Sequence, residues 1–147
     1  MLKEQLSSDL KAAMLSRDTQ KVEVIKGLKS AVLYEEVALK IRDTGLSDEQ
    51  VQQVFAREAK KRAESADLYE KAGQTERAKA EREEKDIIDA YLPQQLGDDE
   101  LTTIVKEVMT GMDNPQMGQV IGAVKARVGQ TADGGRIAAI VKANLAG

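Results

Sequence analysis

The clearest structural signal in the sequence is the stretch Leu46-Ser47-Asp48-Glu49-Gln50-Val51. Ser47 and Gln50 have the spacing of a capping box, in which the serine hydroxyl accepts a hydrogen bond from the Gln50 backbone N–H and the Gln50 side chain reaches back. Leu46 and Val51 stand where the two residues of a hydrophobic staple pack together. We therefore expect a long helix to begin at this stretch.

The helical pattern extends outward from this stretch over the rest of the chain. Apolar residues recur at the spacing of a helix, and no run of alternating β-branched residues lies between turn signals. Gly73 is placed to end the helix that starts at Ser47, because glycine readily adopts the left-handed conformation that follows many helices. The short link Gly73-Gln74 then predicts an antiparallel hairpin with a second helix, which ends at Leu92 before Pro93.

Charge spacing supports the two helices of this hairpin, which contain few large apolar side chains. At three places an acidic residue stands four positions before a basic one, the better orientation for an ion pair within a helix. Each such pair stabilises a helix by about 0.2–0.5 kcal/mol. The expected pairs are Glu58–Arg62, Asp67–Lys71 and Glu81–Lys85.

The composition changes at Pro93, where we place a domain boundary. Of the 47 charged residues, 36 precede Pro93 and 11 follow it. Three shorter helical segments follow, and Asp133 is placed to cap the last of them. We expect an all-α fold with an N-terminal helical domain over residues 1–92, which contains the long antiparallel hairpin, and a C-terminal three-helix bundle over residues 97–147.

The composition excludes several classes of chemistry. The 147 residues include no cysteine and no histidine, so disulfides, thiol catalysis, thiolate metal sites and a Ser–His–Asp triad are excluded. The neighbouring acidic pairs Asp98-Asp99 and Glu83-Glu84 belong to charged helix surfaces, where we do not expect the desolvation that usually shifts a carboxyl pKa. We therefore expect no catalytic residue, no cofactor and no metal.

The chain is slightly acidic and carries no sign of a membrane segment. Its net charge is −3 and its pI is about 5.2, so binding to nucleic acid would need a local basic patch. No apolar run approaches the length of a membrane span, and no signal-peptide pattern is present. We expect a cytoplasmic protein with no membrane partner.

Seven short blocks carry a resemblance to a known family. Three lie in the second half of the chain: Tyr91-Leu92-Pro93-Gln94-Gln95-Leu96, Met117-Gly118-Gln119-Val120-Ile121-Gly122 and Gly129-Gln130-Thr131-Ala132-Asp133-Gly134. Four lie in the first half: Lys26-Gly27-Leu28-Lys29-Ser30-Ala31, Leu46-Ser47-Asp48-Glu49-Gln50-Val51, Lys60-Lys61-Arg62-Ala63-Glu64-Ser65 and Ala72-Gly73-Gln74. In order and spacing these blocks resemble the YqeY family over nearly the whole chain.

The resemblance implies an all-helical fold and a link to tRNA-dependent amidation. The YqeY family shares its domain with the tail region of GatB, the tRNA-binding subunit of glutamine-dependent aminoacyl-tRNA amidotransferases. The chemistry of that enzyme belongs to another subunit and to a catalytic domain that is absent from this chain, so the resemblance does not imply catalysis. The partners that it implies are tRNA and amidotransferase or tRNA synthetase proteins.

The first candidate for nucleic-acid binding is a basic stripe on the long helix. Arg57, Lys60 and Lys61 stand at positions i, i+3 and i+4, so they share one face of the helix. Such a face could follow a phosphate backbone. The alternative is a solvated helix face whose cations pair with Glu58, Glu64 and their neighbours.

The second candidate surrounds a glycine-containing loop near the end of the chain. Its basic residues, which we call the C-terminal set, are Lys125, Arg127, Arg136 and Lys142, and the loop contributes Gly129 and Gly134. The two arginines would flank the loop at Gly129, and Gly134 stands at the start of a helix, where free backbone N–H groups favour anions such as an RNA phosphate. The alternative is that Asp133 merely caps this helix, and its own charge would repel a phosphate.

The third candidate is a pair of glycines, Gly118 and Gly122, next to Met117. One interpretation is a smooth surface that admits an RNA backbone. The alternative is tight packing between helices, with Met117 in the core, and we expect close packing to explain Gly27 in the second helix as well.

Two functions of different classes are consistent with these patterns. The first is a non-catalytic, tRNA-interacting accessory module related to glutamine-dependent aminoacyl-tRNA amidotransferase, motivated by the resemblance and the basic residues. The second is a protein–protein adaptor or self-associating helical module with no RNA role, motivated by the acidic pI and by the mixed charges of the hairpin. An independent enzyme is disfavoured, because the sequence has no P-loop, no G-x-S-x-G motif and no histidine.

Overall fold

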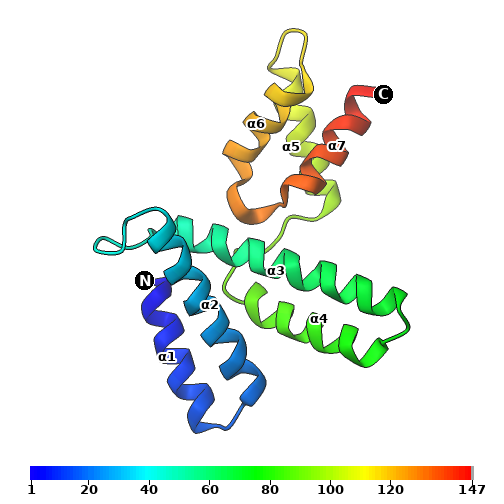
Figure 1. The fold of residues 1–147 in the computed structure, drawn as a ribbon. Helices are drawn as coiled ribbons and strands as arrows, with labels where there is room; N and C mark the ends of the chain where they lie inside the picture. Colours follow the sequence, from blue (N-terminus) through cyan, green and yellow to red (C-terminus); the bar gives the residue numbers. More distant parts are fainter. Residues whose placement is uncertain (147) are drawn as a thin grey trace. The chain divides into compact units, whose positions relative to one another are not determined.

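The structure is a computed structural model and describes residues 1–146. It confirms the all-α prediction: over these residues the chain forms seven α-helices and no strand (Figure 1). The helices are α1 (Leu2–Leu15), α2 (Thr19–Ala38), α3 (Asp48–Lys71), α4 (Thr75–Asp89), α5 (Asp98–Thr110), α6 (Met117–Val128) and α7 (Gly134–Ala146), with a short 3₁₀ turn, η1 (Gly129–Thr131), before α7.

The chain divides into two compact units, Met1–Leu92 and Pro93–Gly147, and each has its own apolar core. In the first unit the core surrounds Phe55, whose side chain is fully buried. Its ring meets the ring of Tyr91 edge to face, with 5.8 Å between the centroids. The Tyr91 hydroxyl donates a hydrogen bond to the Asp9 carboxylate, and burial together with this carboxylate raises the pKa of Tyr91. These contacts join the segment after α4 to α3 and α1.

The start and the end of α3 follow the predicted pattern. Ser47 Oγ accepts a hydrogen bond from the Gln50 N–H at 3.2 Å, and Gln50 Oε1 accepts one from the Ser47 N–H at 2.9 Å, so the capping box is confirmed. Leu46 and Val51 are buried in the same core. Gly73 follows α3 with a φ of +76°, a conformation that glycine adopts without steric cost.

The charged residues of α3 and α4 pair both between the two helices and along each of them, since Lys61 pairs with Glu58 within α3 and Lys85 pairs with Asp89 within α4. Within residues 1–146 the structure forms none of the expected pairs Glu58–Arg62, Asp67–Lys71 and Glu81–Lys85. Arg62 of α3 lies 2.8 Å from a carboxylate oxygen of Glu84 and 3.5 Å from one of Glu81, and Arg82 of α4 pairs with Glu70. The prediction was wrong because spacing does not show which of several carboxylates a cation meets: Arg62 pairs with the facing helix, and Lys85 pairs with Asp89 of its own helix.

A buried carboxylate ties α1, α2 and the loop before α3 together. The residue is Glu36, which is only 4% exposed. Its Oε2 accepts hydrogen bonds from Lys3 Nζ at 2.7 Å and from the Leu46 N–H at 2.8 Å. The lysine first, and then the backbone donor, hold the pKa of Glu36 below its usual range. Gly45 lies so close that a Cβ there would be 3.0 Å from both charged groups, so a larger residue would disturb the ion pair.

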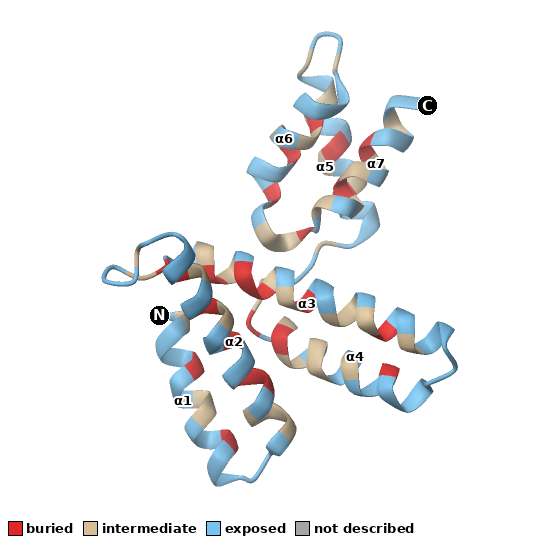
Figure 2. Ribbon diagram, in the orientation of Figure 1, coloured by how far each residue is buried: buried red, intermediate tan, exposed pale blue. Residues whose placement is uncertain are grey.

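The second unit is a set of three helices around aliphatic side chains (Figure 2). Its fully buried residues are Leu101, Val105, Val120, Val124, Ile137 and Val141. Met117 is 39% exposed, so its predicted burial was wrong, because the first buried residue of α6 is Val120. Asp133 Oδ1 accepts a hydrogen bond from the Gly135 N–H at 2.7 Å, which confirms the predicted cap of α7. None of the helices in residues 1–146 is long and apolar enough to cross a bilayer.

Candidate nucleic-acid interface

The basic stripe on α3 is largely engaged by carboxylates of the same unit. Arg57 Nη2 lies 3.1 Å from Glu35 Oε2 of α2, and Lys61 Nζ lies 3.2 Å from Glu58 Oε1 of the preceding turn. Lys60 is exposed and forms no ion pair within the described residues. Of the three cations that the sequence places on one face, the structure therefore leaves only Lys60 without a carboxylate partner among residues 1–146.

The two arginines of the C-terminal set are engaged with α5 and the segment before it. Arg127, near the end of α6, pairs with Glu107 of α5. Arg136, in the first turn of α7, donates hydrogen bonds to the Leu96 carbonyl at 2.7 Å and to an Asp98 carboxylate oxygen at 2.8 Å. Both guanidinium groups therefore hold the three-helix unit together.

The turn at Gly129 packs against the segment that precedes α5. Gly129 has a φ of +58°, which allows the chain to reverse after α6. The Leu96 N–H donates to the Thr131 carbonyl at 2.7 Å, and Gln95 Nε2 donates to the Gln130 carbonyl at 2.8 Å. Two of the blocks that carry the family resemblance, residues 91–96 and 129–134, are therefore in contact. Spacing along the sequence does not predict this contact, because the two blocks are more than 30 residues apart.

Lys125 differs from the two arginines because its ammonium group forms no ion pair within the described part of the chain. The lysine is exposed. A Cβ built on Gly134 would lie 3.3 Å from Lys125 Cε and 3.4 Å from Nζ, so the lysine passes directly over the first residue of α7. A helix N-terminus carries partial positive charge. Lys125 and the start of α7 therefore both favour an anion at this place, next to the negative charge of Asp133.

The glycines of α6 lie on an open surface. Gly118 and Gly122 are exposed, and a Cβ built on either would meet nothing within 4 Å. The interpretation as tight helix packing was therefore wrong, and so was the same interpretation of Gly27 on α2, which is equally open. The reason is that α6 packs through Val120 and Val124, which lie on the opposite side of the helix.

Four residues of this surface form a continuous strip, which we call the α6 face: Gly118, Gly122, Lys125 and Gly129. Their spacing of four, three and four residues places them on one side of the helix. All four are exposed. Because three of them lack a side chain, an extended anion can come close to the helix backbone beside the lysine. The chemistry that this arrangement offers is anion binding.

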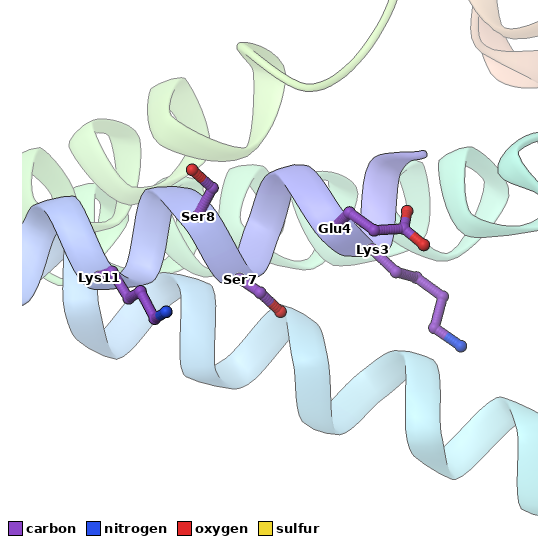
Figure 3. Close-up of a pocket in the computed structure, with 5 residues that line it drawn as sticks. All are labelled: Lys3, Glu4, Ser7, Ser8 and Lys11. Atoms are coloured by element: carbon purple, nitrogen blue, oxygen red, sulfur yellow. The ribbon is translucent and has the colours of Figure 1, made fainter.

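Two surface hollows lie on the first unit. One, of about 470 Å³, is a shallow depression along α1, and Figure 3 shows its polar lining: Lys3, Glu4, Ser7, Ser8 and Lys11. A second, of about 330 Å³, lies between α1 and α2, where Lys29 Nζ is 3.3 Å from Ser7 Oγ. The carboxylate at this second hollow, Glu36, is already bonded to Lys3 and Leu46. Among residues 1–146 no group of acidic side chains is arranged to hold a metal ion.

Comparison with known proteins links almost the whole chain to one family. A family model described as Yqey-like protein matches residues 3–145. This match extends from α1 to α7 and so includes both compact units. No curated protein matches the chain.

Proposed function

The chain belongs to the YqeY family, and from this premise we propose that it is a non-catalytic accessory module that interacts with tRNA. The proposal includes a relation to glutamine-dependent aminoacyl-tRNA amidotransferases, which the resemblance to the tail region of GatB implies. Carbon–nitrogen ligation with glutamine as the amido donor would then be carried out by amidotransferase or tRNA synthetase partners in the cytoplasm, and this chain would contribute RNA contacts.

The observation that carries the proposal is the α6 face. It combines a lysine that has no carboxylate partner in the described residues with glycines that leave the helix backbone accessible. Phosphate groups are recognised mainly by such cations and by backbone N–H groups at helix starts. Arg136 contributes to this surface indirectly, because its hydrogen bonds to Leu96 and Asp98 hold the start of α7 in place beside Lys125.

Binding through this face is expected to be weak and sensitive to salt. Each phosphate that a protein neutralises contributes a slope of about −0.7 to −0.9 to the logarithm of affinity against the logarithm of salt concentration. Lys125 is the cation of the C-terminal set that lies over the start of α7, and it has no carboxylate partner in residues 1–146, so its contribution to the slope should be about −0.7 to −0.9. The net charge of −3 opposes association with RNA.

A titration with bulk tRNA at several salt concentrations tests the proposal. The Lys125→Gln variant should bind several-fold more weakly and with a shallower salt dependence than the wild type. Lys106→Gln is the matched control, because Lys106 is an exposed lysine on α5 of the same unit and lies outside the C-terminal set. Wild-type protein that shows no salt-dependent binding at low salt would rule out the RNA function. Equal binding by the wild type and Lys125→Gln would rule out the α6 face, and a Lys60→Gln variant then tests α3.

A second function, a protein–protein adaptor or self-associating helical module, is favoured by a different observation. The outer side of α2 exposes three large apolar side chains, Leu33, Tyr34 and Val37, and exposed apolar surface of this kind is typical of protein interfaces. Purification of the tagged chain from native extract, with and without nuclease, separates the two functions. Partners that remain after nuclease treatment support the adaptor, whereas partners that nuclease removes support the RNA function.

A further inference from the structure

Helix α2 is apolar on two opposite sides, but only one of them is packed. Its buried residues are Val24, Ile25, Leu28, Val32 and Glu36. On the other side, Leu33, Tyr34 and Val37 are 45%, 77% and 55% exposed. A group of large apolar side chains on the surface of a helix is often covered by a partner. Within residues 1–146 nothing covers these three side chains.

The exposed side of α2 has the spacing of a coiled-coil seam. Glu23, Gly27, Ser30, Tyr34 and Val37 follow one another at intervals of four, three, four and three residues, and this repeat keeps them on one line along the helix. We call the last four the α2 seam. The first two residues of the seam, Gly27 and Ser30, are small, and the last two, Tyr34 and Val37, are large. A Cβ built on Gly27 would meet nothing within 4 Å. The seam therefore has two shallow sites and two protruding side chains.

We propose that the α2 seam packs antiparallel against the same seam of a second copy of this chain. In this arrangement Tyr34 of each copy lies against Ser30 of the other, and Val37 lies against Gly27. Every layer then pairs a large residue with a small one, as close packing of two helices requires. A parallel arrangement would instead place Tyr34 against Tyr34, where the side chains would be too large for close packing, and Gly27 against Gly27, where a cavity would remain.

The charges at the ends of the seam also fit a second copy. Antiparallel alignment brings Glu23 of one chain to residues 40–42 of the other, which include Lys40 and Arg42. None of these three groups forms an ion pair within the described residues. The centre of the seam carries no charge, so it offers nothing to select a strongly acidic or basic partner. Two-fold symmetry, which most homodimers have, would form this charge pairing at both ends of the seam.

The size of the seam predicts a weak dimer. Four side chains on three turns of one helix bury less than the roughly 800 Å² per partner of a standard stable interface. We therefore expect a concentration-dependent equilibrium between monomer and dimer in place of a permanent dimer. The inference rests on the second function proposed above, association between proteins, and narrows the partner to this chain itself.

Sedimentation equilibrium of the nuclease-treated full chain, from micromolar to millimolar concentration, tests the dimer. Tyr34→Lys and Gly27→Leu should each weaken dimerisation at least tenfold, the first by adding charge and the second by filling a shallow site. Both positions are exposed, so neither change disturbs the core. The control is Leu68→Lys, since Leu68 is 67% exposed on α3 and should leave the dimer unchanged. A wild type that stays monomeric, or a dimer that Tyr34→Lys does not weaken, overturns the proposal.

Disulfide cross-linking tests the antiparallel register, and the absence of native cysteine makes the result easy to interpret. Chains carrying Gly27→Cys and chains carrying Val37→Cys should form a disulfide when mixed and oxidised, at least tenfold more than either chain alone. Cross-linking of each chain with itself would indicate a parallel pair and overturn the register. A monomeric chain that still retains a protein partner after nuclease treatment overturns the dimer but leaves the adaptor function intact.

Discussion

The two compact units of this protein use their charged residues in different ways. Residues 1–92 contain 36 of the 47 charges, but two of the three cations in its basic stripe are paired with carboxylates, and Glu36 is buried inside the unit. Residues 93–147 contain 11 charges, and Lys125, which has no carboxylate partner in the part of the chain that the structure describes, lies over the start of α7. Among the candidate cations of both units, the carboxylates of neighbouring helices and turns decide which charges stay available, so spacing along the sequence does not by itself identify an interaction surface.

The largest effect on stability should come from Glu36. We expect Glu36→Ala to lower the free energy of unfolding by about 2–3 kcal/mol, because the buried Leu46 N–H and the Lys3 ammonium both lose their acceptor. Its neighbour Glu35, which pairs with the more exposed Arg57, is the matched control, and Glu35→Ala should cost less than about 1 kcal/mol. Urea denaturation measures both. Equal losses would show that the buried charge is no more important to the unit than an outer one.

The same carboxylate should make the stability depend on pH. The pKa of Glu36 is lowered in the folded chain, first by Lys3 and then by the Leu46 N–H. Its charged form therefore stabilises the fold at neutral pH, and this contribution is lost as the pH falls below the ordinary value of 4.5 and through the lowered pKa. The difference in unfolding free energy between the wild type and Glu36→Gln should narrow over this range. A difference that stays constant as the pH falls would contradict the ion pair.

A smaller effect should come from the ion pairs between α3 and α4. Arg62→Ala leaves the carboxylates of Glu81 and Glu84 close together without their shared cation, and both are less than a quarter exposed. We expect a loss of about 1–2 kcal/mol. Arg82→Ala, which removes a more exposed guanidinium from Glu70, should cost less than about 1 kcal/mol. Thermal unfolding of the two variants side by side would reveal whether burial sets the difference.

The features that could be predicted from the sequence depend on residues close together in the chain. The capping box of α3, the left-handed Gly73 and the Asp133 cap each involve contacts within a few residues, and all three are present. By contrast, the ion pair of Arg62 with Glu84 joins residues that are 22 positions apart, and that of Glu36 with Lys3 joins residues that are 33 positions apart. Such partners depend on how helices pack, which local spacing does not encode.

The candidate site shows the same limit. Two glycines four residues apart suit both a tight helix contact and an open surface, and only the position of Val120 and Val124 on the other side of α6 distinguishes the two. The basic residues could be identified from the sequence, but the sequence did not show which of them are free of carboxylate partners and so able to bind a phosphate. Arg127 and Arg136 flank the loop as expected, yet Glu107 and Asp98 of α5 occupy them.

The smallest effect on stability, and the sharpest test of the open α6 face, should come from its glycines. Gly122→Ala should raise the free energy of unfolding by about 0.5–1 kcal/mol, because alanine favours a helix and its methyl group would meet nothing within 4 Å. Gly129→Ala should have the opposite sign, since a φ of +58° strains any residue with a Cβ. If RNA comes close to the α6 backbone, a bulkier Gly122→Leu should lower tRNA affinity while the protein remains at least as stable as the wild type. A variant that binds tRNA as well as the wild type would show that the glycines do not contribute to an RNA surface.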